Sequence, residues 1–333
     1  MTLVDHDRAR AIFYGMALGD ALGWPVEFLE LPQIWAKYGR GGISEPPDPA
    51  LYTDDTQMSI AVAEALIEAG HRDLDVLMGA VARNFIGWKR DPSTPGRAPG
   101  STSIRGGNAL ERGAPWREAG VKDSKGCGSC MRVAPVGYLY QADTTRLERV
   151  ARAQGVLTHR HPTADIACVA AAYLIKLALD GAPPNAYLRA LARHVGGRAP
   201  EFDAALERVE SVLGWPDEET ALRMIGPTRG GGWIAEEAVA MALYCVIRRP
   251  DDFAAAVRLA ANIGGDSDSV AALTGGIQGA RLGTDAIPAD WLARLENHDY
   301  ITGVADRLSA KKALGQAAAA PLASAPPQAV GPD

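Results

Sequence analysis

Apolar residues recur at every third or fourth position along most of the chain, which is the spacing of amphipathic α-helices. The pattern predicts helices over residues 7–20, 57–69, 73–90, 145–156, 163–180, 185–195, 201–213, 235–249, 252–262, 269–282 and 289–311. No segment alternates apolar and polar residues as a half-buried strand does, and no strand–helix–strand order appears. We therefore expect an all-α protein built from many short and medium helices.

Four segments interrupt this pattern and are rich in Gly, Pro, Ser or Asp. They cover residues 21–54, 91–132, 215–233 and 263–268. Irregular segments of this length in a compact domain are usually functional or disordered. The residues from 314 onward are rich in Ala and Pro, so we expect a single domain over residues 1–313 and a disordered tail over residues 314–333.

Composition and charge argue against several classes of protein. Of the 333 residues, 47% are hydrophobic, which is enough for a large core, and the formal net charge is −6. Lys and Arg are scattered rather than clustered, which argues against direct nucleic-acid binding. No run approaches the ~20 apolar residues of a membrane span. The four cysteines are too few for a disulfide framework in so long a chain, so we expect a cytoplasmic protein.

Two pairs of aspartates stand at the expected starts of helices. Asp54 and Asp55 precede one helix, and Asp266 and Asp268 precede another within a glycine-rich stretch. Simple helix capping would account for them, because Asp, Ser and Thr are favoured at these positions for hydrogen bonding alone. The alternative is a hard cation such as Mg²⁺, which prefers oxygen ligands and would remove the repulsion between converging carboxylates. Zinc fits less well, since the ligands are oxygens.

Six segments of the chain occur in the order found in one known family. They are residues 15–28, 52–66, 124–140, 158–175, 231–246 and 262–280, of which "GMALGDALGWPVEF", "YTDDTQMSIAVAEAL" and "NIGGDSDSVAALTGGIQGA" are the most specific. The chain resembles the ADP-ribosylglycohydrolases over roughly residues 8–305. The resemblance implies an orthogonal multi-helix fold with two Mg²⁺ ions, or Mn²⁺, at the base of a cleft.

The resemblance also implies a set of metal ligands, namely Thr53, Asp54, Asp55, Asp266, Asp268 and Ser269. Ser269 stands where the family more often has Thr, and it keeps the hydroxyl. Glu27 matches an acid on a flexible loop that approaches the metals and, in some members, helps position the attacking water. Asp54, Asp55 and Glu27 are therefore the candidate catalytic acids, and the sequence does not choose between them. For Asp20 we expect a supporting role.

A glycine-rich segment matches the family's substrate-binding region. Glycines let successive backbone N–H groups approach an anion such as a diphosphate. The positions that resemblance assigns to the substrate are Ser124, Gly126, Cys127, Gly128, Ser129, His159 and Trp233. Many members have Asn where this chain has Cys127, which puts one side-chain contact in doubt. The segment over residues 96–108 is a candidate wall of the cleft, with disorder as the alternative.

Some of these residues also fit roles outside substrate binding. Cys127 and Cys130 form a CxxC motif, which suggests redox or zinc chemistry in some proteins, but no βαβ pattern or second CxxC accompanies it. His159 and His161 could serve as loop or capping residues. Trp233 follows three glycines and is either a lid over the cleft or an ordinary surface residue. Glu236 and Glu237 are expected to be structural.

The resemblance predicts hydrolysis of the glycosidic bond at C1″ of ADP-ribose in an ADP-ribosylated protein or a small ADP-ribosyl conjugate. A modified nucleic acid enters only as a substrate of this kind, and we expect a monomer. An inactive ADP-ribose-binding or crystallin-like structural protein is the main alternative, and a metal-dependent phosphohydrolase is the third. The linkage that is cleaved (arginine, serine, base or O-acyl) cannot be read from the chain.

Overall fold

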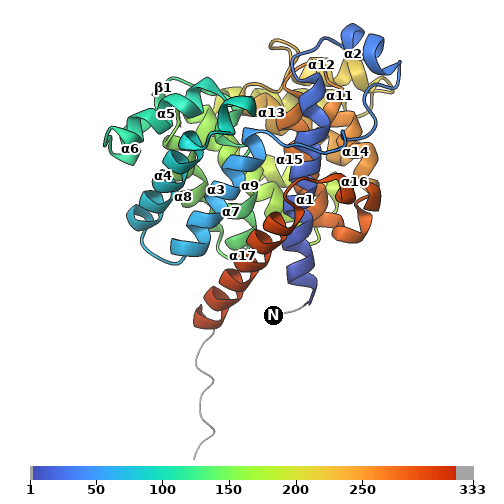
Figure 1. The fold of residues 1–333 in the computed structure, drawn as a ribbon. Helices are drawn as coiled ribbons and strands as arrows, with labels where there is room; N and C mark the ends of the chain where they lie inside the picture. Colours follow the sequence, from blue (N-terminus) through green and yellow to red (C-terminus); the bar gives the residue numbers. More distant parts are fainter. Residues whose placement is uncertain (1–2, 320–333) are drawn as a thin grey trace, which may run out of the picture.

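A computed structural model describes residues 3–319, and α-helices dominate this part of the chain (Figure 1). The helices are α1 (Leu3–Gly23), α2 (Leu31–Tyr38), α3 (Asp54–Ala69), α4 (Leu74–Arg90), α5 (Ser101–Glu111), α6 (Trp116–Ala119), α7 (Ala134–Leu139), α8 (Thr144–Val156), α9 (Pro162–Leu179), α10 (Tyr187–Val195), α11 (Pro200–Val212), α12 (Glu218–Ile225), α13 (Ala235–Arg248), α14 (Phe253–Ala261), α15 (Ser267–Leu282), α16 (Ala289–Arg294) and α17 (His298–Ala319). The expected all-α class is confirmed.

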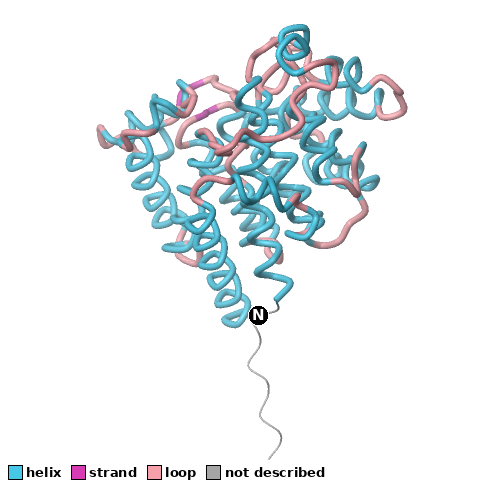
Figure 2. The backbone as a smooth tube through the Cα atoms, turned by 45° about the vertical axis from the view of Figure 1, so that its right-hand side comes forward, coloured by secondary structure: helices cyan, strands magenta, loops and turns pink. Residues whose placement is uncertain are grey.

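The strands are limited to one pair in the described residues. β1 (Val121–Lys122) runs parallel to β2 (His159–Arg160), with Val121 opposite His159. The sequence predicted no strand here, because a two-residue strand is too short to leave a periodic pattern. Figure 2 shows these strands in the upper half of the molecule, where many of the connecting segments also gather.

The centre of the fold is the contact between α1 and α15, which lie side by side in Figure 1. Glycines at four-residue spacing face each other along this contact. A Cβ atom on Gly275 would lie 1.9 Å from the carbonyl oxygen of Gly15, and one on Gly279 would lie 2.0 Å from that of Ala11. Real side chains do not tolerate such distances, so the glycines allow the two backbones to touch. This contact brings the start of α15 next to the end of α1.

Other buried helices surround this pair. α9 and α13 are apolar along most of their length and pack against α15. α9 is the one described helix long and apolar enough to cross a membrane, and 72% of its apolar window is buried inside the structure. The central helix of a packed core has the same length and composition, so this helix carries no argument for a membrane.

The structure differs from the predicted elements in several places. α1 continues to Gly23, so the GDALG sequence is the last turn of a helix rather than a turn between elements. α2, α5 and α12 lie within segments expected to be irregular, and α7 was not predicted. These helices are short or rich in Gly and Ser, and short apolar runs give a weak periodic signal.

The C-terminal part also differs. The helix predicted over 289–311 is two helices, because the chain breaks after Arg294 and Leu295 pairs with Ala50 in an isolated bridge. α17 continues to Ala319, so residues 314–319 extend a helix instead of beginning a disordered tail. The rest of the predicted tail, residues 320–333, lies outside the described residues.

Candidate active site

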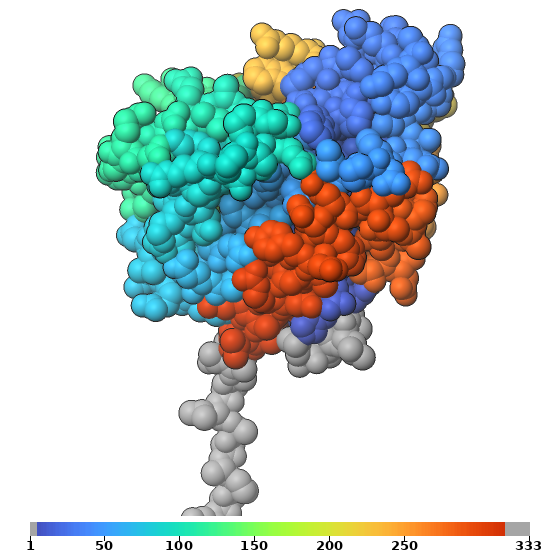
Figure 3. Space-filling view, in the orientation of Figure 1, coloured from blue at the N-terminus to red at the C-terminus, as the bar shows by residue number. Residues whose placement is uncertain are grey.

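The predicted site residues gather at one cleft of about 310 Å³. Figure 3 shows the surface hollowed in its upper part, between the blue N-terminal segment and the teal residues near 100. The cleft is lined by Glu27, Phe28, Asp54, Asp55, Ala98, Gly100, Ser101, Thr102, Ser103, Ser124, Gly126, Cys127, Gly128, Met131, His159, Trp233, Asp266, Asp268 and Ser269. Thr53 and Ser129 are the two predicted residues that lie behind this surface.

Acidic side chains from three distant segments meet at one end of the cleft. Carboxylate oxygens of Glu27, Asp266 and Asp268 lie within 4.8 Å of one another. Asp54 and Asp55 line the same cleft from the start of α3. Both aspartate pairs are at helix N-termini, as the sequence predicted, and the group could bind a metal ion.

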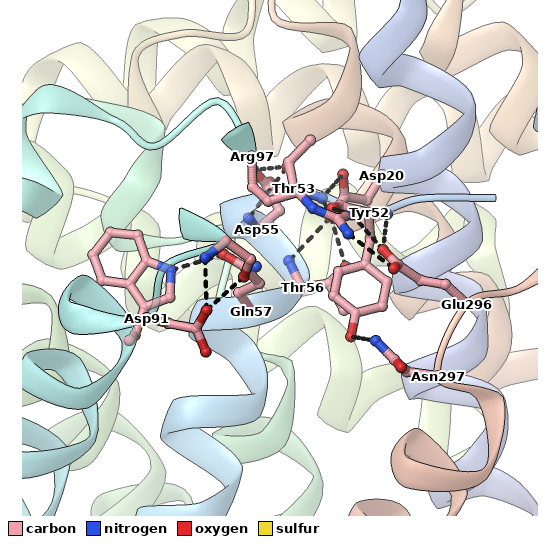
Figure 4. A network of polar contacts seen from close by, with 12 residues as sticks. Asp20, Tyr52, Thr53, Asp55, Thr56, Gln57, Asp91, Arg97, Glu296 and Asn297 are labelled. Carbon is pink, nitrogen blue, oxygen red and sulfur yellow. Dashed lines mark hydrogen bonds and ion pairs between the residues drawn. The ribbon is translucent and has the colours of Figure 1, made fainter. Parts of the chain in front are cut away.

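The start of α3 is held in place by Asp20 from the last turn of α1 (Figure 4). The Asp20 carboxylate accepts hydrogen bonds from the backbone N–H of Thr53 at 2.9 Å and of Thr56 at 3.1 Å, and from the Thr56 hydroxyl at 2.6 Å. Asp20 is fully buried and is not among the residues that line the cleft. Its expected supporting role is therefore consistent with the structure, and Thr56 is occupied by this task.

A second set of polar contacts, made by Arg97 and Glu296, fixes the residues before α3. The Arg97 guanidinium donates to the carbonyl oxygen of Tyr52 at 2.7 Å and pairs with the Glu296 carboxylate through both of its terminal nitrogens (Figure 4). Glu296 in turn accepts the backbone N–H of Tyr52 at 2.9 Å. The carbonyl of Arg97 accepts the N–H of Asp54 at 3.1 Å. Both sides of the segment that leads to Asp54 and Asp55 are thus anchored.

Two of these acids do not act as helix caps. Thr53 is the N-cap of α3, and its hydroxyl accepts the N–H of Asp55 at 3.4 Å. Asp266 is at the N-cap of α15 but its side chain makes no capping bond; its Oδ2 instead accepts the Cys127 thiol at 3.1 Å. Asp54 accepts the N–H of Gly100 at 3.0 Å from another segment. Simple capping therefore does not account for Asp54 and Asp266.

The carboxyl groups at the acidic end have no ion pair with Lys, Arg or His in the part of the chain that the structure describes. Asp55 is buried, and within the described chain its Oδ1 has no hydrogen-bond partner. Burial, followed by repulsion from neighbouring carboxylates, raises the pKa of Glu27 to about 8 and that of Asp54 to about 7. The same causes raise the pKa of Asp55 and Asp268 well above the usual range. This arrangement favours either bound protons or a cation.

The other end of the cleft is built from the glycine-rich segment that contains the short 3₁₀ helix η3 (Cys127–Ser129). This segment is tied to the start of α13, because the N–H of Cys127 donates to the carbonyl of Trp233 at 3.0 Å and that of Ala235 to the carbonyl of Lys125 at 2.9 Å. The Ser129 hydroxyl donates inward, to the carbonyl of Gly126 at 3.1 Å. Cys127 and Ser129, two of the residues predicted to bind the substrate, therefore use the Cys127 N–H and the Ser129 hydroxyl for hydrogen bonds within the protein.

His159 lies directly against this segment. A Cβ atom on Gly126 would be 3.0 Å from its Nε2, and one on Gly128 would be 3.1 Å from its Cε1. Burial, and then the nearby Arg132 charge, lower the pKa of His159 to about 3, so the ring is neutral. The two glycines are needed here because any side chain would press on the imidazole.

A buried arginine determines which nitrogen of His159 carries the proton. Arg132 NH2 donates to the Thr158 hydroxyl oxygen at 2.7 Å, and this oxygen is 2.8 Å from His159 Nδ1. The guanidinium only donates, so the hydroxyl proton goes to another acceptor. His159 Nδ1 at 2.8 Å is closer to this hydroxyl than the Gly155 carbonyl oxygen at 3.4 Å, which favours the imidazole proton on Nε2. That N–H faces Gly126 and the cleft. His159 therefore offers a donor suited to an anionic group.

Sequence reasoning identified residues 96–108 only as a possible wall. The structure shows that α5 begins there and that Ser101, Thr102 and Ser103 line the cleft. The Thr102 hydroxyl is 3.3 Å from that of Ser124, while the buried Ser103 hydroxyl has no partner among the described residues. The serine-rich start of a helix was the available signal, since N–H groups at a helix start attract anions.

The structure also assigns roles to the cysteines, His161 and the two glutamates of α13. All four cysteines are free and buried, and burial raises the pKa of Cys127 and Cys130 well above the usual range, which argues against thiolate chemistry. His161 caps α9, as its Nδ1 accepts the N–H of Thr163 at 3.1 Å. Glu236 pairs with Lys125 at 2.6 Å and Glu237 with the Thr228 hydroxyl at 2.6 Å, so both are structural.

Trp233 forms part of the cleft rim. Its ring lines the cleft, its Nε1 has no partner in the part of the chain that the structure describes, and Arg229 lies 5.3 Å from the ring centre. The three glycines before it all have positive φ angles, which allows the chain to turn tightly against residues 264–266. The tryptophan is thus held at the cleft and is not an ordinary surface residue.

Comparison with known proteins gives consistent results. The profile of the ADP-ribosylglycohydrolase family matches residues 1–318. The ADP-ribosylarginine hydrolase Tri1 of Serratia proteamaculans is 29% identical over 91% of this chain and 79% of its own length. The ADP-ribosyl-[dinitrogen reductase] glycohydrolase of Rhodospirillum rubrum is 28% identical over 87% of this chain and 91% of its own. A solved ADP-ribosylglycohydrolase-related protein complex is 30% identical, with a TM-score of 0.69 over 92% of this chain and 99% of that one.

Proposed function

This chain belongs to the ADP-ribosylglycohydrolase family, and from that premise we propose that it hydrolyses the glycosidic bond at C1″ of ADP-ribose and releases ADP-ribose. The substrate is an ADP-ribosylated protein or a small ADP-ribosyl conjugate. The observation that carries this proposal is one cleft with an acidic cluster at one end and a glycine-rich, neutral segment at the other. The first suits the reacting sugar, and the second suits the diphosphate.

The acidic end fits a pair of divalent cations. Three observations support a cation at this end. An oxygen of Asp55 has no hydrogen-bond partner in the described chain, and Glu27, Asp266 and Asp268 converge. The carboxyl pKa values are also raised, as expected for acids that lack a cationic partner. We propose that Mg²⁺, or Mn²⁺, is held by Thr53, Asp54, Asp55, Asp266, Asp268 and Ser269. Such ions, when bound, would orient hydroxyl groups and lower the pKa of a water molecule.

The chain's own residues then have separate tasks. Asp54 and Asp55 are held rigidly by Asp20 and by the Arg97–Glu296 pair, which suits groups that must fix the sugar or the attacking water. Glu27 precedes the exposed Phe28 on a loop outside the helices, so it is the acid best able to move toward a water molecule. The positive charge that develops on the sugar ring is stabilised by these carboxylates, as in glycoside hydrolysis generally.

The neutral end would bind the diphosphate through uncharged hydrogen-bond donors. His159 offers its Nε2–H, Ser103 offers a hydroxyl with no partner among the described residues, and the start of α5 adds the positive end of a helix dipole. Ser124, Gly126 and Gly128 complete the surface on which the diphosphate lies. Trp233 covers the cleft from the rim, where its ring can pack on a ribose or a base.

The test is a panel of ADP-ribosyl conjugates assayed with the wild type and Asp54→Ala. The panel contains arginine, serine, nucleic-acid base and O-acetyl linkages, each with and without Mg²⁺. We expect metal-dependent release of intact ADP-ribose from at least one linkage and no release by the variant. Release of AMP or phosphate would indicate a phosphohydrolase. Normal ADP-ribose affinity without turnover of any conjugate would indicate a binding protein.

A further inference from the structure

A second groove, larger than the cleft, adjoins its acidic end. It has a volume of about 670 Å³ and lies between the start of α2 and the segment from α12 to Gly230. Phe28 lines both the cleft and the groove, and its side chain is 54% exposed. Gly264, two residues before Asp266, forms the wall on the other side. The groove therefore begins where the acids lie and not where the diphosphate would lie.

The lining of the groove combines an apolar floor with two arginines. Phe28, Leu31, Pro32, Pro227 and Ile263 supply the apolar surface. Arg223, in the last turn of α12, has a side chain that is 56% exposed, and its only described ion pair is an exposed one with Glu219 at 3.0 Å. Exposed pairs of this kind contribute little, so the guanidinium stays available to another anion.

Arg229 lines the groove from the same segment as Arg223, the residues that run from α12 to Gly230. Its φ angle is +49°, a conformation that non-glycine residues adopt rarely, and its guanidinium lies over the Trp233 ring at 5.3 Å. The described residues include no ion pair of Arg229 with a carboxylate. Glu30, at the N-cap of α2, is the one acid among the lining residues. Two cationic groups thus face this groove in a protein whose net charge is −6.

We propose that this groove binds the acceptor side of the substrate, as a polypeptide segment with acidic residues next to the modified side chain. The inference rests on the proposed function, because the bond to be cleaved is then at the acidic end and the acceptor must leave the cleft past Phe28. The apolar floor receives the body of the segment, and Arg223 and Arg229 bind its carboxylates. Charge complementarity of this kind selects partners and speeds their encounter.

The experiment compares two peptides that carry one ADP-ribosyl group in a linkage cleaved by the wild type. One has two Asp on each side of the modified residue and the other has two Lys. The same linkage on a free amino acid is the small reference substrate. We expect the wild type to show a KM about tenfold lower for the acidic peptide, and this preference to shrink as the salt concentration rises.

Arg223→Glu should abolish the preference for the acidic peptide and leave the kinetics of the small reference substrate unchanged. Arg229→Asn, which removes the charge and still tolerates a positive φ, should reduce the preference about threefold. Arg149→Glu is the matched control, because it makes the same charge change at an exposed residue of α8, a helix far from α2 and α12 in Figure 1.

The outcomes separate the two proposals. If the wild type cleaves both peptides with equal KM, or if Arg149→Glu has the same effect as Arg223→Glu, the groove is not an acceptor site although the proposed function stands. An equal rise in KM for the small reference substrate would mean that Arg223→Glu acts on the cleft, and would also overturn the inference. If the wild type cleaves the small reference substrate but no peptide-linked conjugate, the proposal that the groove binds a polypeptide segment is wrong.

Discussion

The two ends of the cleft are built in opposite ways. At the acidic end, charged side chains come from α1, α3, α15 and the loop after η1 (Trp24–Val26), and almost every charged neighbour is another acid. At the neutral end, backbone groups and a neutral imidazole form the surface, and Arg132, a fully buried cation, lies behind it. Arg132 is bound by Gln154 and Thr158, which are uncharged.

This difference shows how the molecule keeps two tasks apart. A buried arginine next to the carboxylates would neutralise them and compete with a cation. Arg132 instead lies behind His159, where burial and then the Arg132 charge lower the pKa of the imidazole, and its contact with the ring runs through the Thr158 hydroxyl. Its charge only partly offsets the raised pKa of Asp54. We therefore expect the acidic end to need a bound cation to offset its carboxylates, whereas the hydrogen-bond donors of the neutral end are in place without any added group.

The strongest test of this contrast is Asp268→Asn. We expect turnover to fall by about 1,000-fold, roughly 4 kcal/mol of barrier, because a proposed metal-binding carboxylate is removed. The metal-free variant should nevertheless be more stable than the metal-free wild type, by about 1 kcal/mol. The pKa of Asp268 is raised in the folded protein, so its ionised form disfavours folding above its unfolded pKa, and the amide has no such charge.

Thermal unfolding in EDTA and in Mg²⁺ measures both effects. Mg²⁺ should raise the melting temperature of the wild type and leave that of Asp268→Asn nearly unchanged. A variant that is less stable than the wild type in EDTA would show that the carboxylates do not repel one another in the way described.

A second test addresses the scaffold that supports the acidic end. Gly275→Ala would place a Cβ atom 1.9 Å from the carbonyl oxygen of Gly15 and force α1 and α15 apart. We expect a loss of about 3 kcal/mol in the free energy of unfolding. The neighbouring Gly276→Ala is the matched control, since its Cβ would have no neighbour closer than 3.8 Å and should stabilise the helix by up to ~1 kcal/mol. Urea denaturation of both variants measures their free energies of unfolding. Equal changes in the two variants would contradict the close contact between α1 and α15.

A third test concerns the neutral end. Thr158→Val removes the hydroxyl between Arg132 and His159 and leaves the Arg132 NH2 with the Gln154 carbonyl oxygen, at 2.9 Å, as its remaining acceptor. We expect KM to rise about five- to tenfold, roughly 1 kcal/mol, with a smaller change in kcat. The ¹⁵N chemical shifts of His159 should show the proton on Nε2 in the wild type and in Thr158→Ser, but a mixture of tautomers in Thr158→Val. A wild-type ring protonated on Nδ1 would contradict the arrangement.

The smallest effect is expected at Cys127, which lies between the two ends. Its thiol donates to Asp266 and lies 3.5 Å from the Ser269 hydroxyl. Cys127→Ser keeps a donor of similar size, so activity should stay within about threefold of the wild type. Because burial raises the pKa of this thiol, a thiol-reactive reagent should modify native protein slowly. Rapid labelling, or a loss of more than about tenfold in the serine variant, would give Cys127 a chemical role.

Prediction from the sequence succeeded where a pattern is local. The long helices α3, α4, α9 and α13 follow from their apolar periodicity, and both aspartate pairs stand at helix starts as expected. The helices α2, α5 and α12 were missed because eight to eleven residues make only two or three turns, which is too short a window for a periodic pattern to stand out among the flanking Gly, Pro and Ser. The segment that contains α5 was expected only as a possible wall of the cleft, with disorder as the alternative, because its helix was not predicted.

Two of the predicted substrate-binding residues make hydrogen bonds within the protein that the sequence did not reveal. Ser129 and the N–H of Cys127 belong to the expected segment, yet their hydrogen bonds close within the protein. Whether these donors are free for a substrate depends on which carbonyl groups lie next to them in the fold, here those of Gly126 and Trp233. A single sequence contains no information on a partner far along the chain unless a motif marks it.

The amino-acid sequence alone determined the helical class, the family resemblance and the identity of the acids, because periodicity and motifs are properties of neighbouring residues. Only the tertiary structure decided that Glu27, Asp55 and Asp268 share one cleft whose described lining contains no Lys or Arg, and that Arg132 lies behind the neutral end instead. These relations require the close approach of α1 to α15, and electrostatic interaction depends on distance in space. The second groove beside Phe28 arises in the same way, from segments that meet only when the chain is folded.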